Sequence, residues 1–327
     1  MIVNFVVFPS CVYVGTHIEK PGKVVQRGGF CTIHVGKDPA NDYYDPELKE
    51  KNISGVTQNS NFKLIRGDIL NVSLLADIFS GTQNPIPTKV VHLAAMAGVR
   101  SSIVNPGIYV DVDVRGTVNL LEMVRKYNIE QFIFASSSSV YGTNEKAPFS
   151  ENDPVELQIS PYATAKRAAE IFCKTYNNLY GIPITILRLF TVYGERQRPD
   201  MAIRKFVKLI MENKPLPMFG DGSSIRDYTY IKDCIDCVFS AIETPMDFEI
   251  INIGSGKTIS LKALIEILER VTGKKIKTKQ LEEQTGDVPQ TYADISKAKR
   301  LLGYNPGVGI EEGIKNFYNW YTQLIPD

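Results

Sequence analysis

Residues 132–142 of the chain read FIFASSSSVYG, and this stretch decides how the rest of the sequence is interpreted. Its first half is apolar and rich in Phe and Ile, which predicts a buried strand, and four serines follow that strand directly. In open α/β sheets, ligands bind beyond the carboxyl ends of the strands. We therefore expect the serine side chains to lie at a ligand-binding edge of a sheet.

A second segment, residues 162–166, reads YATAK and opens a stretch with helical spacing. On a helix, Tyr162 and Lys166 lie on one face because residues four apart are neighbours. A nearby ammonium lowers the pKa of a tyrosine from its usual value of about 10, and a phenol tuned in this way can act as a general base or acid. Alone, the Tyr–Lys pair could be a surface pair and the serines could form only a turn. Together, after a predicted strand, they favour a catalytic role.

Outward from these segments, short apolar runs rich in Val, Ile and Phe alternate with stretches of helical spacing. We expect helices at residues 116–126 and 163–178, and buried strands at residues 5–8, 32–35, 62–65, 89–93, 131–135 and 185–189. Such alternation forms βαβ units and a parallel sheet. We therefore expect an α/β fold: a doubly wound parallel sheet in residues 1–195, with later segments weaving back, and a smaller C-terminal α/β lobe in residues 196–327.

The composition narrows the class of protein. The 327 residues carry 37 Lys and Arg against 36 Asp and Glu, a net charge of +1, and 43% of them are hydrophobic. A disordered chain would be less hydrophobic and more highly charged, and a polybasic binder of nucleic acid or membrane surfaces would carry a basic excess. We therefore expect a globular protein that binds neither nucleic acid nor membranes.

The first 15 residues, MIVNFVVFPSCVYVG, are almost wholly apolar, but they do not resemble a targeting segment. They lack a basic start, Pro9 interrupts them, and they are shorter than the ~18–20 residues that a membrane span needs. The five cysteines, an odd number in a long chain, indicate a reduced, cytoplasmic compartment. Cys234 and Cys237 form one CxxC pair, and structural zinc needs four ligands, so we expect buried cysteines and no metal.

Taken in order, the motifs resemble the extended short-chain dehydrogenases/reductases of the nucleotide-sugar epimerase/dehydratase group. Besides SSSSVYG, the resemblance rests on GDI at residues 67–69, HLAA at 92–95, SPYATAK at 160–166, RLFTVYG at 188–194, RPDM at 198–201, IRDYTYIKD at 225–233 and GDVPQTYADISKA at 286–298. It covers essentially the whole chain and is closest to the subfamily that epimerises UDP-glucuronate at C4. It implies a Rossmann-like sheet, tightly held NAD, a UDP-sugar substrate, a 4-keto intermediate and a homodimer formed through the helices at 116–126 and 163–178.

The resemblance also implies a role for each matching residue. Tyr162 would be the base for the 4-hydroxyl proton, Lys166 would tune it and hold the nicotinamide ribose, and Ser137 would orient the hydroxyl. The cofactor would meet, besides Tyr162 and Lys166, Gly15, Asp38, Asp68, Ile69, Leu93, Ala94, Ala95 and Ser136. The UDP-sugar would meet Ser138, Ser139, Thr191, Arg198, Arg226 and Asp287, where a guanidinium suits an anionic sugar and its diphosphate.

One region departs from the family pattern. The first strand should be followed by GxxGxxG, but the three glycine positions hold Pro9, Val12 and Gly15. The first glycine permits a tight turn and the second a close approach of the pyrophosphate, whereas Pro9 fixes φ and removes an amide donor. Three interpretations stay open: an altered start of the sequence, weak binding of NAD, or a relative without catalysis. A smaller departure is Asp113, where the extended family usually has Asn.

Other functions are compatible with the same motifs. A 4-epimerase of UDP-glucose or UDP-N-acetylglucosamine differs in few contacts from one that acts on UDP-glucuronate. A 4,6-dehydratase needs an acidic pair after its first serine or threonine, and SSSSVYG offers none. A sugar-nucleotide-binding protein that lacks catalysis is the alternative from another functional class, and the changed glycine loop is what favours it.

Overall fold

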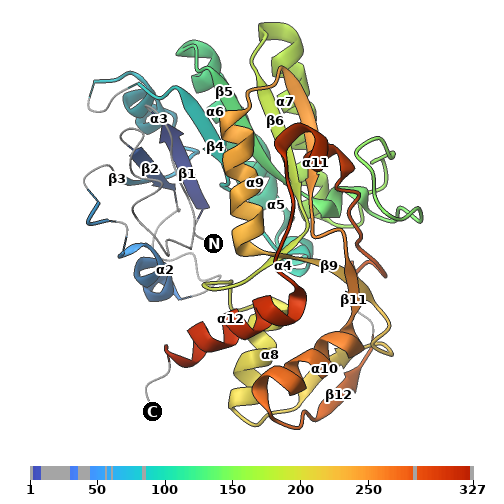
Figure 1. Ribbon diagram of the computed structural model, residues 1–327. Coiled ribbons are helices and arrows are strands. Elements are labelled where there is room, and N and C mark those ends of the chain that lie inside the picture. Colours follow the sequence, from blue (N-terminus) through green and yellow to red (C-terminus); the bar gives the residue numbers. More distant parts are fainter. Residues whose placement is uncertain are drawn as a thin grey trace. The chain divides into compact units, whose positions relative to one another are not determined.

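The structure is a computed structural model that describes residues 3–8, 30–35, 45–55, 57–59, 62–82, 86–282 and 286–324 (Figure 1). Its contacts divide the chain into two compact units. Unit 1 comprises Met1–Gly142, Val155–Arg188 and Val238–Ile251, and unit 2 comprises Thr143–Pro154, Leu189–Cys237 and Asn252–Asp327. Neither unit is one continuous stretch, because segments far apart in the sequence build each of them.

A seven-stranded sheet in the order β10-β6-β5-β4-β1-β2-β3 forms the centre of unit 1. All six predicted strands are present, with slightly different limits. The strands are β1 (Val3–Phe8), β2 (Phe30–Val35), β3 (Phe62–Gly67), β4 (Lys89–His92), β5 (Gln131–Ser137), β6 (Ile184–Leu189) and β10 (Phe248–Ile253). Strands β2 and β3 pair in parallel, as do β4 and β5. The α/β class and the Rossmann-like strand order are confirmed.

The first strand departs from the expected all-parallel arrangement. β1 runs antiparallel to both of its neighbours, with Phe8 opposite Lys89 of β4 and Val7 opposite Cys31 of β2. Its carboxyl end therefore lies where β4 begins, at the edge opposite to the carboxyl end of β4.

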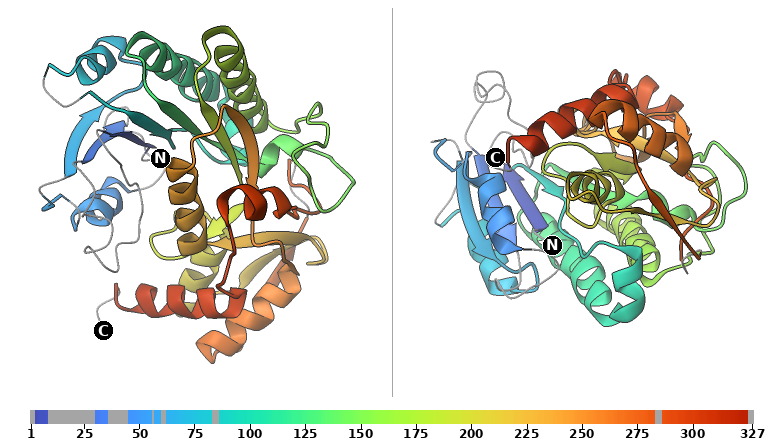
Figure 2. Two further views of the ribbon diagram at one scale, coloured as in Figure 1. Left: turned by 45° about the horizontal axis from the view of Figure 1, so that its top comes forward. Right: turned by 90° about the horizontal axis from the view of Figure 1, so that it is seen from below.

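Helices cover the sheet of unit 1. They are α2 (Pro46–Ile53), α3 (Val72–Phe79), α4 (Val99–Val104), α5 (Pro106–Tyr109), the π-helix η1 (Val110–Arg115), α6 (Gly116–Lys126), the 3-10 turn η2 (Ser138–Tyr141) and α7 (Pro161–Tyr180). α6 and α7 confirm the two predicted helices. Figure 2 shows α3, α6 and α7 along one face of the sheet, in keeping with the contacts of α6 to both of the others.

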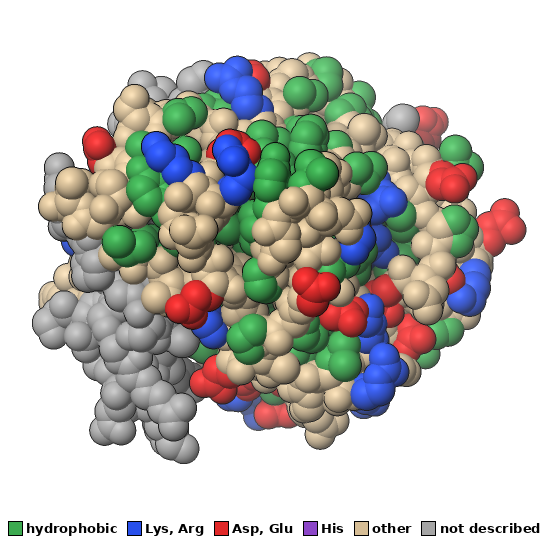
Figure 3. Space-filling model, turned by 90° about the horizontal axis from the view of Figure 1, so that it is seen from above, with side chains coloured by type: hydrophobic (Ala, Val, Ile, Leu, Met, Phe, Trp, Pro, Cys, Tyr) green, Lys and Arg blue, Asp and Glu red, His purple; other side chains and the backbone are tan. Residues whose placement is uncertain are grey.

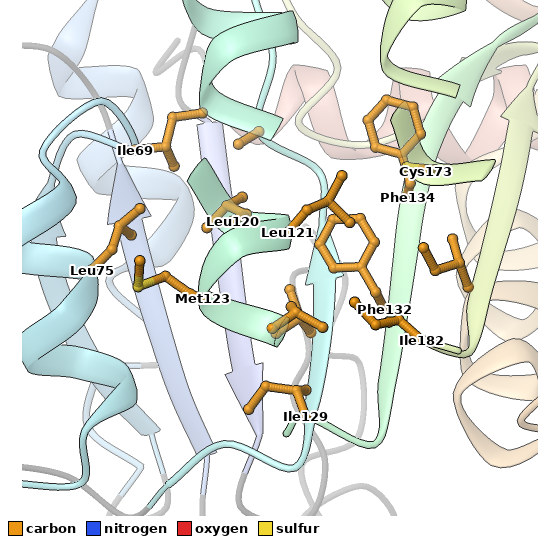
Figure 4. Packing of buried hydrophobic residues seen from close by; sticks show 14 of the residues in the cluster. Ile69, Leu75, Leu120, Leu121, Met123, Ile129, Phe132, Phe134, Cys173 and Ile182 are labelled. Carbon is orange, nitrogen blue, oxygen red and sulfur yellow. The ribbon is translucent and has the colours of Figure 1, made fainter. Parts of the chain in front are cut away.

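The core of unit 1 lies between these helices and the strands. Figure 4 shows Ile69, Leu75, Leu120 and Phe132 pointing into one cluster, and all four are buried. The cluster requires a glycine at the start of α6, because a Cβ atom on Gly116 would lie 2.3 Å from Ile69 Cδ1. Apolar burial of this kind contributes roughly 25 cal/mol per Å², and it fixes α6 and α7 against the sheet.

Unit 2 contains a three-stranded sheet in the order β11-β9-β7 and a parallel pair β12-β8. Its elements are β7 (Thr191–Tyr193), α8 (Ala202–Met211), β8 (Leu216–Phe219), β9 (Ile225–Tyr230), α9 (Ile231–Glu243), β11 (Thr258–Ser260), α10 (Leu261–Thr272), β12 (Thr278–Leu281), α11 (Ser296–Leu302) and α12 (Ile310–Thr322), with the last part of α9 in unit 1. The aromatic stripe of α12 packs in this core, as expected, with Phe317 and Trp320 rings 5.6 Å apart.

The remaining general features concern cysteines, membranes and charge. Cys173, Cys234 and Cys237 are free and buried, as predicted for the CxxC pair. Within the part of the chain that the structure describes, no three His, Cys, Asp or Glu side chains gather as metal ligands, and no helix has the length and apolar character needed to cross a membrane. Figure 3 shows basic and acidic side chains intermixed on one face.

Candidate active site

The carboxyl end of β5 presents the serines. Every residue of β5 is buried, and its last residue, Ser137, accepts the backbone N–H of Ser139 at 3.1 Å. This contact caps the short turn η2, which reverses the chain at the sheet edge. The Ser137 hydroxyl also donates to Ser139 Oγ at 3.2 Å. Ser136 points the other way, and its hydroxyl donates to Glu170 Oε1 at 2.6 Å.

Helix α7 brings the tyrosine and the lysine to the same edge. Ser160 caps the helix by accepting Ala163 N–H at 3.2 Å, and Pro161 occupies the first turn, where no amide donor is needed. Tyr162 and Lys166 follow one turn apart, as the spacing predicts. The helix packs against both β5 and η2, so its first turns lie beside the serines. Tyr162 is partly buried, with its ring edge-on to Tyr109 at 6.1 Å.

Lys166 is almost fully buried, with 3% of its surface exposed. Its Nζ donates to Ala135 O at 3.0 Å and lies 5.0 Å from the centre of the Phe134 ring. Burial lowers the pKa of Lys166, and the negative charges of Asp113 and Glu170 partly offset that effect. An ammonium has three N–H groups, and Ala135 O accepts one of them, so donors remain for a ligand hydroxyl.

Glu170 and Arg188 hold the two elements of this site together. The Arg188 guanidinium pairs bidentately with Glu170, at 2.9 Å for both contacts, and both side chains are buried. Because Arg188 lies on β6, Glu170 on α7 and Ser136 on β5, the cluster joins three elements next to the serines. Sequence reasoning missed it, although Arg188 opens the RLFTVYG motif, because nothing in the sequence says which buried carboxylate an arginine meets.

On the cofactor side, the described residues lie after β3 and β4. Asp68 accepts Leu70 N–H at 2.9 Å in a tight turn, while Asn71, and not Asp68, caps α3. Ile69 is buried in the core of unit 1 and offers its carbonyl to Asn119. Leu93, Ala94 and Ala95 follow β4 directly. Gly15 and Asp38 lie outside the described residues.

The four substrate residues expected in the C-terminal half all belong to unit 2. Thr191 lies on β7, opposite Tyr228 of β9. Arg198 pairs with Asp200 through two contacts of 3.0 Å. Arg226, on β9, donates to Ile225 O, and burial lowers the pKa of its guanidinium while the charge of Asp287 raises it. The charge of Asp287 therefore acts on Arg226, and a shared ligand of these two residues stays a prediction.

The residues present fit a nicotinamide dinucleotide at its reacting end. Two alanines, Ala94 and Ala95, lie just after the end of β4, and Lys166 keeps donors beside the end of β5. Asp113 Oδ2 is buried and has no hydrogen-bond partner among the described residues. A buried acceptor of this kind is expected to be satisfied when a ligand binds. The arrangement suits a dinucleotide that lies across the carboxyl ends of the strands.

A Rossmann-like strand order with serines at the end of β5 and a Tyr–Lys pair on α7 defines an extended short-chain dehydrogenase/reductase of the nucleotide-sugar epimerase/dehydratase group. Within that class the chain belongs to the family described as GDP-mannose 4,6 dehydratase, whose family model matches residues 35–317. The serines of this chain continue as Ser138, Ser139 and Val140, without the acidic pair of a dehydratase.

Several relatives of established name are similar along most of the chain. A UDP-glucuronate 4-epimerase of Thermodesulfobacterium geofontis is 44% identical over 313 residues, which covers 95% of this chain and 93% of the relative. UDP-glucuronate 4-epimerase 4 of Arabidopsis thaliana is 39% identical and covers 94% of this chain and 73% of its own length. The crystal structure of UDP-glucuronic acid 4-epimerase from Bacillus cereus with UDP-glucuronic acid and NAD is 39% identical, has a TM-score of 0.81, and covers 90% of this chain and 91% of its own.

Proposed function

We propose that this protein is an NAD-dependent nucleotide-sugar 4-epimerase that interconverts UDP-glucuronate and UDP-galacturonate. The observation that carries the proposal is the placement of Tyr162 and Lys166, one turn apart on α7, beside the serines that end β5. The names of the relatives and the bound ligands of the solved neighbours support the same sugar and the same cofactor.

The chain's own residues supply the proton chemistry. Tyr162 takes the proton of the sugar 4-hydroxyl, and the positive charge of Lys166 favours the phenolate form that does so. Ser137 donates a hydrogen bond to the oxygen of the same hydroxyl, which directs the 4-hydroxyl proton toward Tyr162. The chemistry that bound NAD would supply is hydride transfer at sugar C4, away from one face and back to the other, while Tyr162 would return its proton to the 4-oxygen, so that C4 is inverted without net redox change.

The substrate contacts belong to the same proposal. Ser138 and Ser139, in the turn after Ser137, are polar groups at the sheet edge and suit the sugar hydroxyls. In unit 2, the guanidinium groups of Arg198 and Arg226 suit the hexuronate carboxylate and the diphosphate, and Asp287 suits a ribose hydroxyl. Thr191 completes the set as a contact to the hexuronate. These roles rest on the resemblance and on the chemistry of each side chain.

The cofactor residues follow in the same way. Lys166 holds the nicotinamide ribose, with Leu93, Ala94, Ala95 and Ser136 along the middle of NAD and Asp68 and Ile69 near adenine. Because the Ser136 hydroxyl donates to Glu170, Ser136 meets the cofactor through its backbone. Gly15 and Asp38 complete the proposed set.

The direct test is incubation of the purified protein and added NAD with UDP-glucuronate, UDP-glucose or UDP-N-acetylglucosamine, followed by chromatographic separation of the product sugars. We expect UDP-galacturonate from UDP-glucuronate. The other two substrates should react much more slowly, because their sugars offer no carboxylate to the guanidinium proposed to bind it. Faster conversion of UDP-glucose or UDP-N-acetylglucosamine would show that this sugar nucleotide, and not UDP-glucuronate, is the substrate. If no substrate is converted and no NAD is released on denaturation, the protein is not an epimerase, and a sugar-nucleotide-binding protein without catalysis is the alternative that remains.

A homodimer in a reduced, cytoplasmic compartment is also proposed. Apolar side chains are exposed on the helices expected at the dimer contact and beside them: Val104 (87%), Val110 (59%), Ile171 (52%) and Leu179 (65%). A groove of about 610 Å³ lined by η1 and the start of α7 lies on the same surface of unit 1. Exposed apolar surface of this kind marks an interaction site. Free, buried cysteines support the compartment.

Light scattering after gel filtration tests the dimer. Ile171→Glu combined with Leu179→Glu is expected to halve the measured mass, because two charges would be buried in the contact. Val72→Glu is the control: Val72 is 49% exposed, but it lies on α3, which is not one of the helices expected at the contact. A dimer that survives the α7 changes, or a wild-type monomer, would contradict the proposal.

A further inference from the structure

Asp113 is a buried carboxyl group that the proposed chemistry does not yet use. It is 1% exposed and lies on the π-helix η1, between α5 and α6. Its Oδ1 accepts the backbone N–H of Met96 at 2.5 Å, while Oδ2 has no hydrogen-bond partner among the described residues. A buried carboxylate oxygen without a donor is costly, so its presence calls for a function.

The backbone around Asp113 is built to place it. In η1 the N–H of Gly116 bonds to Asp111 O, five residues back, which widens the helix by one residue per turn. Such π-turns are rare and occur frequently at functional sites. The hydroxyl of Thr117 donates to Asp113 O at 2.6 Å and also contacts His92 Nε2 at 2.9 Å. These bonds hold η1 against the end of β4.

The charge that faces Asp113 comes from α7, which packs directly on η1. Lys166 attracts the Asp113 carboxylate, and in turn Asp113 and Glu170 favour the charged form of Lys166. The other ionisable groups around the pair are Tyr162 and Cys173 on α7, Tyr109 on α5 and His92 on β4. Burial keeps the pKa of His92 well below its usual value, and it raises the pKa of the Cys173 thiol. Among the described residues, Asp113 and Glu170 are therefore the negative charges that act on Lys166.

Of these two carboxylates, Glu170 is the one with guanidinium partners. It is bound by Arg188 and by Arg167, so much of its charge is already balanced. The Asp113 carboxylate receives one backbone N–H. Burial raises the pKa of Asp113 to about 7, against the opposing effect of Lys166 and of the Met96 N–H. Its charge therefore changes within the working range of an enzyme.

We propose that Asp113 is a positioning residue of the active site, whose carboxylate keeps the buried Lys166 in its ammonium form and so keeps Tyr162 able to exchange the 4-hydroxyl proton. The inference rests on the proposed function, because it acts through Tyr162 and Lys166. The Asp113 carboxylate can act on the pKa of Lys166 in one direction only, upward. Without a negative charge at residue 113, burial acts on Lys166 with less opposition, and Lys166 loses its proton at a lower pH.

The test is the pH dependence of kcat for wild type and for Asp113→Asn, both saturated with NAD and UDP-glucuronate. Asparagine keeps an oxygen for the Met96 N–H but cannot ionise. We expect the alkaline limb of kcat to move to lower pH by about one unit in Asp113→Asn. The matched control is Asp111→Asn, which removes the same charge from an exposed position of the same π-helix. It is expected to leave the profile unchanged.

A second measurement does not depend on activity. Because burial raises the pKa of Asp113 above its unfolded value, the folded protein binds the extra proton, and its stability falls as pH rises from about 4 to about 7. Asp113→Asn lacks this loss. We expect its melting temperature to be close to that of wild type near about pH 4 and several degrees higher than that of wild type near about pH 8.

The outcomes separate the two proposals. If wild type epimerises UDP-glucuronate but Asp113→Asn has an unshifted alkaline limb, the role of Asp113 is wrong and the proposed function stands. If wild type has no epimerase activity, the proposed function fails, and the role of Asp113 fails with it. In that case the melting curves still show whether the buried carboxyl titrates near neutrality. Equal pH dependence of the two melting curves would overturn the charge coupling itself.

Discussion

The end of β5 and the sequence around β1 differ in how well their residues suit the same cofactor, NAD. At the end of β5, serines, the Tyr162–Lys166 pair and a buried ion pair lie together, and hydrogen bonds join Ser136 to Glu170 and Lys166 to Ala135. At the start, Pro9 and Val12 replace glycines, and β1 runs antiparallel to β4. The match to the family model begins only at residue 35, after both changes.

The two halves of a dinucleotide site therefore depend on different kinds of interaction. The reacting half needs side chains with defined proton chemistry, which the end of β5 and α7 supply. The phosphate half needs backbone N–H groups and room for close approach, which depend on glycine and not on any side chain. A chain can therefore retain the first half while the second is altered. The following variants test how independent the two halves are.

The largest expected effect is on turnover. Tyr162→Phe removes the phenolic proton acceptor and leaves the ring in place, so kcat is expected to fall by about 10³-fold. UDP-sugar affinity, measured by calorimetry, is expected to stay within about twofold, since the diphosphate and uridine contacts are elsewhere. Tyr180→Phe at the end of the same helix is the control. Retention of most activity by Tyr162→Phe would contradict the assignment of the base.

The next largest effect is expected on stability, at the cluster beside the end of β5. Glu170→Gln removes the charge that balances Arg188, which is buried at 1% exposure. Breaking a buried ion pair from one side typically costs about 3–5 kcal/mol, and we expect a loss of that size in the free energy of unfolding measured with denaturant. The loss should persist at high salt, because a buried pair is little screened. A change below about 1 kcal/mol would show that burial does not strengthen this pair beyond an exposed one.

Much of the reacting half could be predicted from the sequence, because its elements are local. The apolar run before the serines, the Tyr–Lys spacing and the helical period of α7 each depend on neighbours in the chain. The Glu170–Arg188 pair and the Asp113–Lys166 coupling could not, because they join residues from different elements. The direction of β1 was predicted wrongly, since an apolar run of that length fits a strand in either orientation.

A smaller effect is expected from repair of the phosphate half. Pro9→Gly combined with Val12→Gly restores the turn and the approach that a pyrophosphate needs. We expect NAD affinity to rise by about tenfold, roughly 1.4 kcal/mol, measured by calorimetry and by NAD released from the purified protein on denaturation. kcat at saturating NAD should not change, because Tyr162 and Lys166 are untouched. Equal NAD occupancy before and after the repair would reject this account of the loop.

The smallest effect is expected from an exposed ion pair closer to the start of the chain. Arg66 on β3 also meets a glutamate, Glu50 on α2, through two contacts, at 2.6 and 2.7 Å, but the two side chains are 56% and 52% exposed. Glu50→Gln should therefore cost only about 0.2–1 kcal/mol in the free energy of unfolding, and less at high salt. Compared with Glu170→Gln, it contrasts an exposed arginine–glutamate pair with a buried one, in which Glu170 also accepts from Ser136 and Arg167. Equal losses in the two variants would mean that burial does not set the strength of these pairs.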